Sequence, residues 1–128
     1  MLRRYLLSRR ALLRLAPLAL AATLPPAPLT AHALVTVAEP TPGATVSASG
    51  FDIRLTYNSR IDHRRSKLVI LNEEDRETVV PQLSESGAPN RVIARAPALP
   101  PGRYRLRWQV LAVDGHVTRG DIPFRVGR

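Results

Sequence analysis

Alternation of apolar and polar side chains with a period of two is the feature that most constrains the fold of this chain. The pattern is clearest at Tyr104, Leu106, Trp108 and Val110, which alternate with three arginines and a glutamine. A β-strand directs successive side chains to opposite faces of its sheet. This segment therefore predicts a strand with one packed face and one face in water.

The same period recurs in shorter segments along the chain. The predicted strands are 34–38, 51–57, 67–71, 77–83, 91–96, 104–110 and 122–126. Clusters of Pro, Gly, Asn and Ser separate them, and residues 32–128 contain no sustained helical periodicity. About seven short strands in about a hundred residues predict an all-β fold, an antiparallel β-sandwich of immunoglobulin-like architecture.

Composition excludes several classes of site. The chain has no cysteine, and its one methionine is Met1, so disulfides, thiolate metal sites, a cysteine nucleophile and a thioether metal site are excluded. Of 19 Lys and Arg, five lie before residue 32, where no acidic residue occurs, so the remainder has a net charge of +4 (14 − 10). The arginines at 103, 105 and 107 face away from the apolar side of their strand, which predicts a solvated surface and no nucleic-acid partner.

Residues 1–31 have the composition of a cleaved export signal. A basic start is followed by an apolar run at 15–24 and then by small residues. The run is about half of the roughly 20 residues that span a bilayer. Residues 8–14, Ser-Arg-Arg-Ala-Leu-Leu-Arg, resemble a twin-arginine signal, and an arginine-rich Sec signal is the alternative. We expect a cleaved signal at 1–31 and one exported domain at 32–128.

Two cleavage points compete in this segment. Cleavage after Ala31 makes His32 the new N-terminus, whereas cleavage after Ala33 uses a neater A-x-A match and removes His32. Sequence rules leave both open, and the expected chemistry depends on which one is used.

Two short segments predict a metal site. Asp114-Gly115-His116 lies in a turn between two strongly alternating strands, and a glycine there allows the carboxylate and the imidazole to point the same way. An N-terminal His32 would add an amine and an imidazole that chelate one ion. This nitrogen and oxygen donor set suits tetragonal Cu(II), with zinc as the competitor.

Each segment alone has a structural interpretation. Asp-Gly is common in hairpin turns, and a histidine near a processing site can be without function. The two together, in an exported domain without cysteine, favour the metal site. His63 is predicted to lie in a loop beside Arg64, Arg65 and Lys67, and we exclude it from the site because nearby positive charge disfavours metal binding.

The combination of motifs resembles the CopC family of periplasmic copper-binding proteins. The matching features are His32-Ala-Leu-Val, Pro40-x-Pro-Gly43, Gly102-x-Tyr-x-Leu-x-Trp108, Asp114-x-His116 and Gly120-x-x-x-Phe124-x-Val126. The likeness covers essentially all of residues 32–128. It implies a Greek-key β-sandwich that binds one Cu(II) through the amine and imidazole of His32, the carboxylate of Asp114 and the imidazole of His116, and it favours cleavage before His32.

The resemblance also implies a role in copper homeostasis, resistance or delivery, often with a membrane copper transporter of the CopD type. The chain departs from members that carry a methionine-rich Cu(I) loop, so we expect no Cu(I) site. We expect a monomer without enzymatic activity. Two other functions stay open on the sequence: an oxidative copper enzyme that uses the same N-terminal histidine chelate, and a metal-free adhesion or interaction domain.

Overall fold

The computed structural model describes residues 32–83 and 87–128, and these residues form eight strands and no helix. The strands are β1 (Val35–Glu39), β2 (Thr45–Val46), β3 (Phe51–Tyr57), β4 (Ile61–Leu71), β5 (Glu77–Val80), β6 (Arg91–Ala96), β7 (Gly102–Ala112) and β8 (Val117–Val126). The signal predicted at 1–31 lies outside the described residues. Within the described ranges, no helix is long and apolar enough to cross a bilayer.

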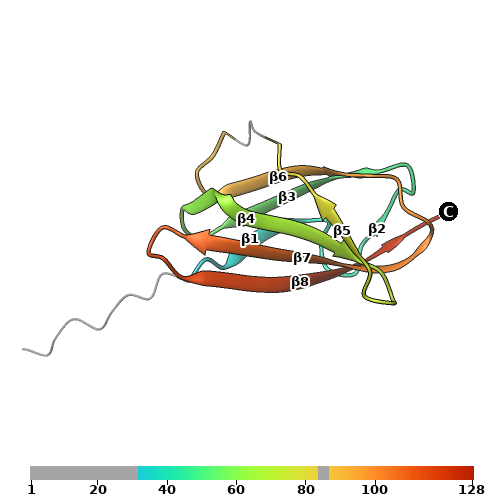
Figure 1. Cartoon of the computed structure of the whole chain (residues 1–128). Coiled ribbons are helices and arrows are strands. Elements are labelled where there is room, and N and C mark those ends of the chain that lie inside the picture. The colour runs from blue at the N-terminus through green and yellow to red at the C-terminus, as the bar shows by residue number, and fades with distance from the viewer. Residues whose placement is uncertain (1–31, 84–86) are drawn as a thin grey trace, which may run out of the picture.

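Two sheets pack face to face in a β-sandwich, as predicted (Figure 1). The smaller sheet has the strand order β1-β3-β6, and the larger has the order β2-β8-β7-β4-β5. The chain changes sheets after β1, β2, β3, β5 and β6, so β3 pairs with β6 while β4 pairs with β7. All of these pairings are antiparallel except that of β2 with β8, which is parallel.

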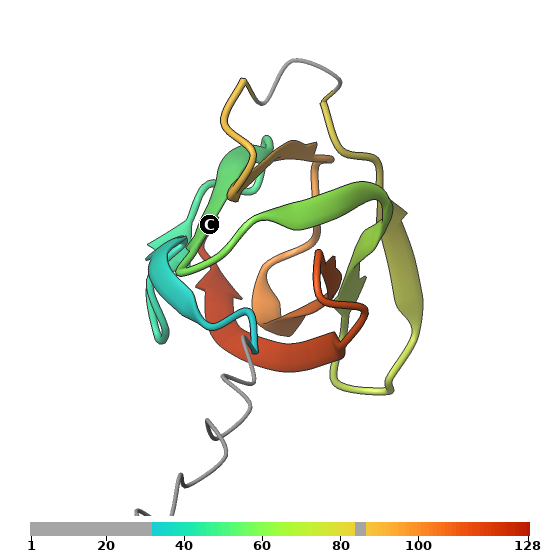
Figure 2. The ribbon, with the colours of Figure 1, turned by 90° about the vertical axis from the view of Figure 1, so that its left-hand side faces the viewer.

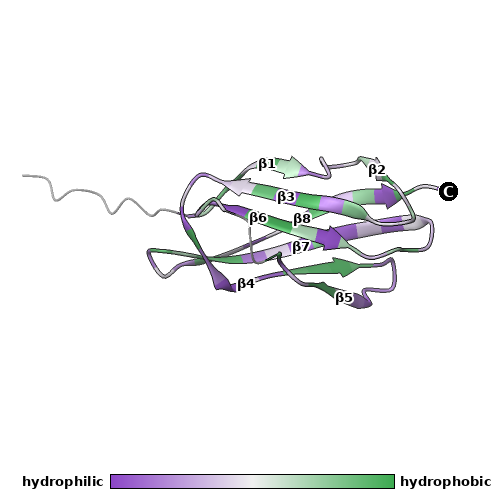
Figure 3. Ribbon diagram, turned by 90° about the horizontal axis from the view of Figure 1, so that it is seen from above, coloured by the Kyte–Doolittle hydropathy of each residue, from purple (hydrophilic) through white to green (hydrophobic). Residues whose placement is uncertain are grey.

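The predicted alternation determines which side chains form the core. Along β3, the side chains of Phe51, Ile53, Leu55 and Tyr57 are buried, and the intervening ones face solvent. The hydropathy colouring in Figure 3 shows this alternation of apolar and polar residues along the strands. Nineteen buried residues from both sheets form one hydrophobic cluster, which gives the domain a single core.

Several strand boundaries differ from the prediction: β7 is longer at both ends, and β8 begins at Val117 rather than at residue 122. The two-residue strand β2 was not predicted, because its only pairing is with β8, far away in the sequence. The strand predicted at 77–83 ends at Val80, since Pro81 follows and cannot donate a backbone hydrogen bond. Gln82 then makes an isolated bridge to Ala94 of the other sheet, so the chain changes sheets at this point.

The prediction that His63 lies in a loop was wrong. Strand β4 begins at Ile61, six residues before the predicted start, and its pairing with β7 is interrupted between Asp62 and Lys67. This bulge breaks the alternation that marks a strand in sequence. His63 is half-buried there, and its Nε2 lies 2.7 Å from the carbonyl oxygen of Arg91. The imidazole therefore links β4 to β6.

Candidate metal centre

The segments that carry the residues predicted to bind metal, the chain before β1 and the β7–β8 loop, lie at the same end of the sandwich (Figure 2). The rings of His32 and His116 are close to each other there. His32 precedes β1 of the smaller sheet, and the hairpin loop that contains Asp114 and His116 joins β7 to β8 of the larger sheet. The turn between β3 and β4 lies at the same end, because the backbone N–H of Val113 donates to the carbonyl oxygen of Arg60 at 3.4 Å.

A tight loop brings Asp114 and His116 together, as the spacing predicted. Ala112 and His116 are joined by a backbone hydrogen bond of 2.8 Å, and Gly115 has a φ of +89°, which L-residues with a side chain rarely adopt. The backbone N–H of His116 donates to Oδ1 of Asp114 at 3.0 Å, and the Nδ1 of the imidazole lies 3.0 Å from Oδ2. The carboxylate thus orients the imidazole. Binding of one ion by both groups would require the imidazole to turn away from this contact.

His32 is held in place by the two residues that follow it. Ala33 is completely buried in the hydrophobic cluster. The backbone N–H of Leu34 donates to Oδ1 of Asn58 at 2.8 Å, and the carbonyl oxygen of Leu34 accepts from the N–H of Asn58 at 2.9 Å. Neither anchor was predicted from sequence, because each depends on a contact between residues far apart in the chain.

The two imidazoles lie within the range that one metal ion requires. The ring centroids of His32 and His116 are 5.5 Å apart, with an angle of 67° between the planes. Two imidazoles bound to one divalent ion at about 2.0 Å have centroids roughly 4.4 Å apart when cis and roughly 6.2 Å apart when trans. The observed separation lies between these limits, so the distance between the rings is compatible with binding to one ion.

The carboxylate of Asp114 is held in its charged form. The hydrogen bond from the backbone N–H of His116 and that from its imidazole lower the pKa of the Asp114 carboxyl below its ordinary value, with a smaller contribution from His32. Among the described residues, no three His, Cys, Asp or Glu side chains already form a group that could hold an ion. Because the side chain of His116 is 53% exposed, it can rotate toward a bound ion at little cost.

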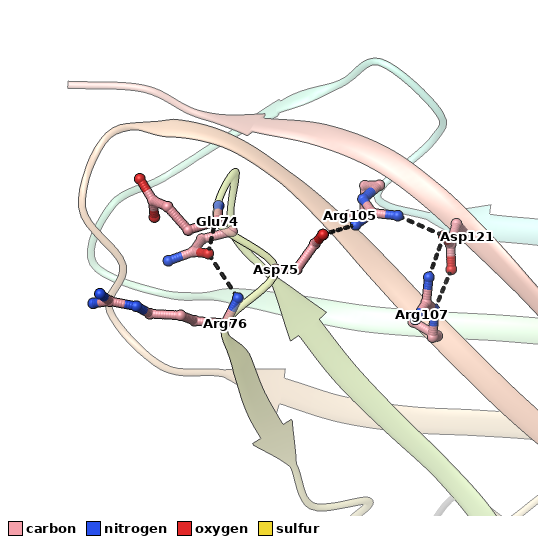
Figure 4. Close-up of polar contacts among 7 residues, drawn as sticks. Glu74, Asp75, Arg76, Arg105, Arg107 and Asp121 are labelled. Carbon is pink, nitrogen blue, oxygen red and sulfur yellow. Dashed lines mark hydrogen bonds and ion pairs between the residues drawn. The ribbon is translucent and has the colours of Figure 1, made fainter.

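The outward-facing arginines of β7, at 103, 105 and 107, are paired with carboxylates. Figure 4 shows that Arg105 contacts both Asp75 and Asp121, and that Arg107 binds Asp121 through two hydrogen bonds of 2.8 and 2.9 Å. The guanidinium of Arg107 lowers the pKa of the Asp121 carboxyl, and Arg105 adds to the effect. This outer face of the larger sheet is therefore a network of alternating charges.

Comparison with known proteins agrees with the fold. The model of the CopC domain matches residues 35–127. The chain belongs to the CopC family. Protein YobA of Escherichia coli strain K12 is 31% identical over 98 residues, which cover 75% of this chain and 79% of YobA.

Solved structures of the family share the fold. CopC from Methylosinus trichosporium OB3b has a TM-score of 0.67 and 26% identity, covering 74% of this chain and 93% of that protein. PcoC from Escherichia coli, a methionine-rich copper resistance protein, has a TM-score of 0.58 and 22% identity, covering 76% and 100%. This CopC-family chain is not rich in methionine, because Met1 is its only one.

Proposed function

We propose that this CopC-family chain is a periplasmic copper resistance protein whose processed form binds one Cu(II) through His32, Asp114 and His116. The observation that carries the proposal is the meeting of these three residues at one end of the sandwich, from segments about eighty residues apart. The amine and imidazole of His32, the imidazole of His116 and the carboxylate of Asp114 would supply four donors. Such a nitrogen and oxygen set suits tetragonal Cu(II).

Burial of Ala33 supports cleavage before His32. If the signal were removed after Ala33, the domain would lose a side chain that is completely buried in its core, together with the histidine. Cleavage after Ala31 retains both residues. It also places the free amine next to an anchored segment, because both the backbone N–H and the carbonyl oxygen of Leu34 are hydrogen-bonded to Asn58. A chelate on such an anchored terminus loses less conformational entropy when the ion binds.

The absence of methionine after Met1 favours Cu(II) over Cu(I). Thioether sulfur is a soft ligand that selects Cu(I), whereas imidazole, amine and carboxylate groups suit the harder cupric ion. We infer a binding role rather than a catalytic one, in a monomer that exchanges copper with a membrane transporter of the CopD type.

The proposal is tested by copper titration of protein purified from the periplasm, with its first residue fixed by intact mass. We expect a mass that begins at His32, one Cu(II) per chain and a tetragonal EPR signal with nitrogen hyperfine structure. His116→Ala should weaken binding by at least about a hundredfold, because loss of one strong ligand costs several kcal/mol.

A variant with one alanine inserted before His32, and processed to begin with it, tests the chelate directly, because the amine of His32 is then part of a peptide bond. We expect a weaker affinity and an altered EPR spectrum. His63→Gln is the matched control, since it removes a histidine that lies in β4 and hydrogen-bonds to the backbone of Arg91. If the extended protein bound Cu(II) as tightly as the native one, or if His63→Gln were as damaging as His116→Ala, the proposed site would be wrong.

A further inference from the structure

Three exposed aliphatic side chains surround the proposed copper site. They are Leu34, Val113 and Val117, which are 57%, 67% and 52% exposed. Each lies within two residues of a proposed ligand, and together they make up half of the six large exposed hydrophobic residues among those that the structure describes. We name these three side chains the collar. Exposed apolar residues that gather at one site mark an interaction surface more often than single scattered ones do.

Two arginines beside the collar have no carboxylate partner among the described residues. The carbonyl oxygen of Arg60 accepts a hydrogen bond from Val113, which places this residue against the hairpin loop. Arg119 shares the lining of a groove with Leu34, and its Nε donates to the neutral Oε1 of Gln109 at 2.9 Å. Both side chains are exposed. They therefore contrast with the arginines of β7, whose charges are offset by acidic neighbours.

The collar continues into an apolar groove between β1 and β8. This groove has a volume of about 800 Å³ and is lined by Leu34, by residues of β1, by Trp108 of β7 and by Thr118 of β8. The Oγ1 of Thr118 is buried and has no hydrogen-bond partner. The apolar surface beside the proposed copper site is therefore larger than the collar alone.

The charges determine which kind of partner fits this surface. A second copy of the chain would bring two pairs of unpaired arginines together, and bound copper would add to the repulsion, since Cu(II) with one carboxylate and neutral nitrogen ligands has a charge of +1. A partner with acidic side chains around an apolar contact would be attracted instead. Such complementarity mainly accelerates association and determines its specificity.

We propose that the collar, flanked by Arg60 and Arg119, is the docking surface for a protein partner that presents apolar and acidic side chains and exchanges Cu(II) with the site. The exchange step rests on the proposed function, whereas docking does not require copper. The collar would exclude water from the contact, and the two arginines would orient the partner.

Docking is tested on the copper-free processed protein by NMR, with a synthetic peptide of alternating Leu and Glu as the probe and the same peptide with Lys for Glu as its control. We expect amide shifts from the acidic peptide at Leu34, Arg60, Val113 and Val117, and weak or no shifts from the basic one. Added salt should weaken the acidic complex, because exposed charges are screened.

Matched variants separate local docking from general surface properties. Val113→Ser and Arg60→Ala should each weaken binding of the acidic peptide roughly fivefold, the effect of about 1 kcal/mol. Val79→Ser and Arg76→Ala remove the same kinds of side chain elsewhere. Val79 is 69% exposed on β5, and Arg76, just before β5, has no carboxylate partner within the part of the chain that the structure describes. These two should leave the affinity unchanged.

Several outcomes would overturn the docking proposal. They are an absence of shifts with the acidic peptide, shifts centred on another face, equal effects of the control variants, dimerisation of the protein through the collar, and tighter binding to phosphatidylglycerol vesicles than to the peptide. Copper titration of Val113→Ser tests the proposed function independently. If this variant binds Cu(II) normally but loses peptide binding, both proposals hold, whereas a native protein that binds peptide but no copper would refute only the proposed function.

Discussion

The contact between Gly120 and Trp108 makes Gly120→Ala a sharp test of how the sandwich is packed. Gly120 of β8 pairs with Trp108 of β7, and a Cβ atom built on the glycine would lie 2.4, 2.6 and 2.8 Å from three atoms of the indole ring. Ordinary carbon contacts lie at about 3.5–4.0 Å. The indole would therefore have to move by about 1 Å.

The surroundings of Trp108 limit that movement. The indole is 7% exposed and packs edge to face against Tyr57 at a centroid distance of 5.4 Å. Overpacking of this kind costs about 1–3 kcal/mol. For a domain of this size, 1 kcal/mol corresponds to roughly 4–8 °C in Tm. We expect Gly120→Ala to lower the free energy of unfolding by about 2 kcal/mol and to shift the fluorescence of the single tryptophan to the red, because the ring moves toward the groove.

Urea denaturation followed by tryptophan fluorescence and by far-UV circular dichroism measures both effects. Gly43→Ala is the control: its φ of +82° makes the substitution strained, but no atom lies within 4 Å of the new methyl group. It should cost about 1 kcal/mol from the backbone alone and leave the emission maximum unchanged. In a Trp108→Leu background the cost of Gly120→Ala should fall, since the contacted ring is absent. If Gly120→Ala were within about 0.5 kcal/mol of the native protein with unchanged emission, this account of the packing would be refuted.

Two further predictions concern the anchoring of the site and the acid stability of the domain. Asn58→Ala removes the acceptor for the N–H of Leu34. We therefore expect competition titrations to show that the processed protein binds Cu(II) roughly fivefold more weakly, the effect of about 1 kcal/mol. An unchanged affinity would show that this anchor does not position His32. Asp121 has a pKa lowered by Arg107, so its contribution to stability is present above the unfolded pKa of about 4 and is lost as pH falls through the folded value. In urea titrations, Asp121→Asn should therefore lower the free energy of unfolding by about 1 kcal/mol at pH 7. This difference in stability between the variant and the native protein should disappear near pH 2, and a difference that did not depend on pH would contradict the prediction.

Sequence patterns predicted those parts of the fold that depend on one strand at a time. The alternation in β3, β7 and β8 identified their buried faces, because a two-residue period is a local property of a half-buried strand. The first half of β4 was missed, since its bulge breaks that period, and β2 was missed because two residues carry no pattern. Both become strands through pairing with β7 and β8, which no local sequence feature reports.

The candidate site divides in the same way. The Asp-Gly-His spacing predicted that Asp114 and His116 would face each other, because the turn that joins them is only three residues long. That His32 lies beside this turn follows from contacts across the fold. The complete burial of Ala33 and the hydrogen bonds between Leu34 and Asn58 fix the start of β1, and neither residue type suggests such a role in sequence.

Placement of the proposed ligands on opposite sheets would link copper binding to the stability of the whole sandwich. His32 is attached to β1, whereas His116 leads into β8, and these two strands are not paired with each other in the structure that covers 32–83 and 87–128. A bound ion would therefore join the two sheets across the groove between β1 and β8. Because ligand binding stabilises the folded state in proportion to RT ln(1 + [L]/Kd), copper would oppose separation of the sheets at this end. By the same linkage, any change that moves β8 relative to β1 must also alter the affinity for copper, even when it touches none of the ligands.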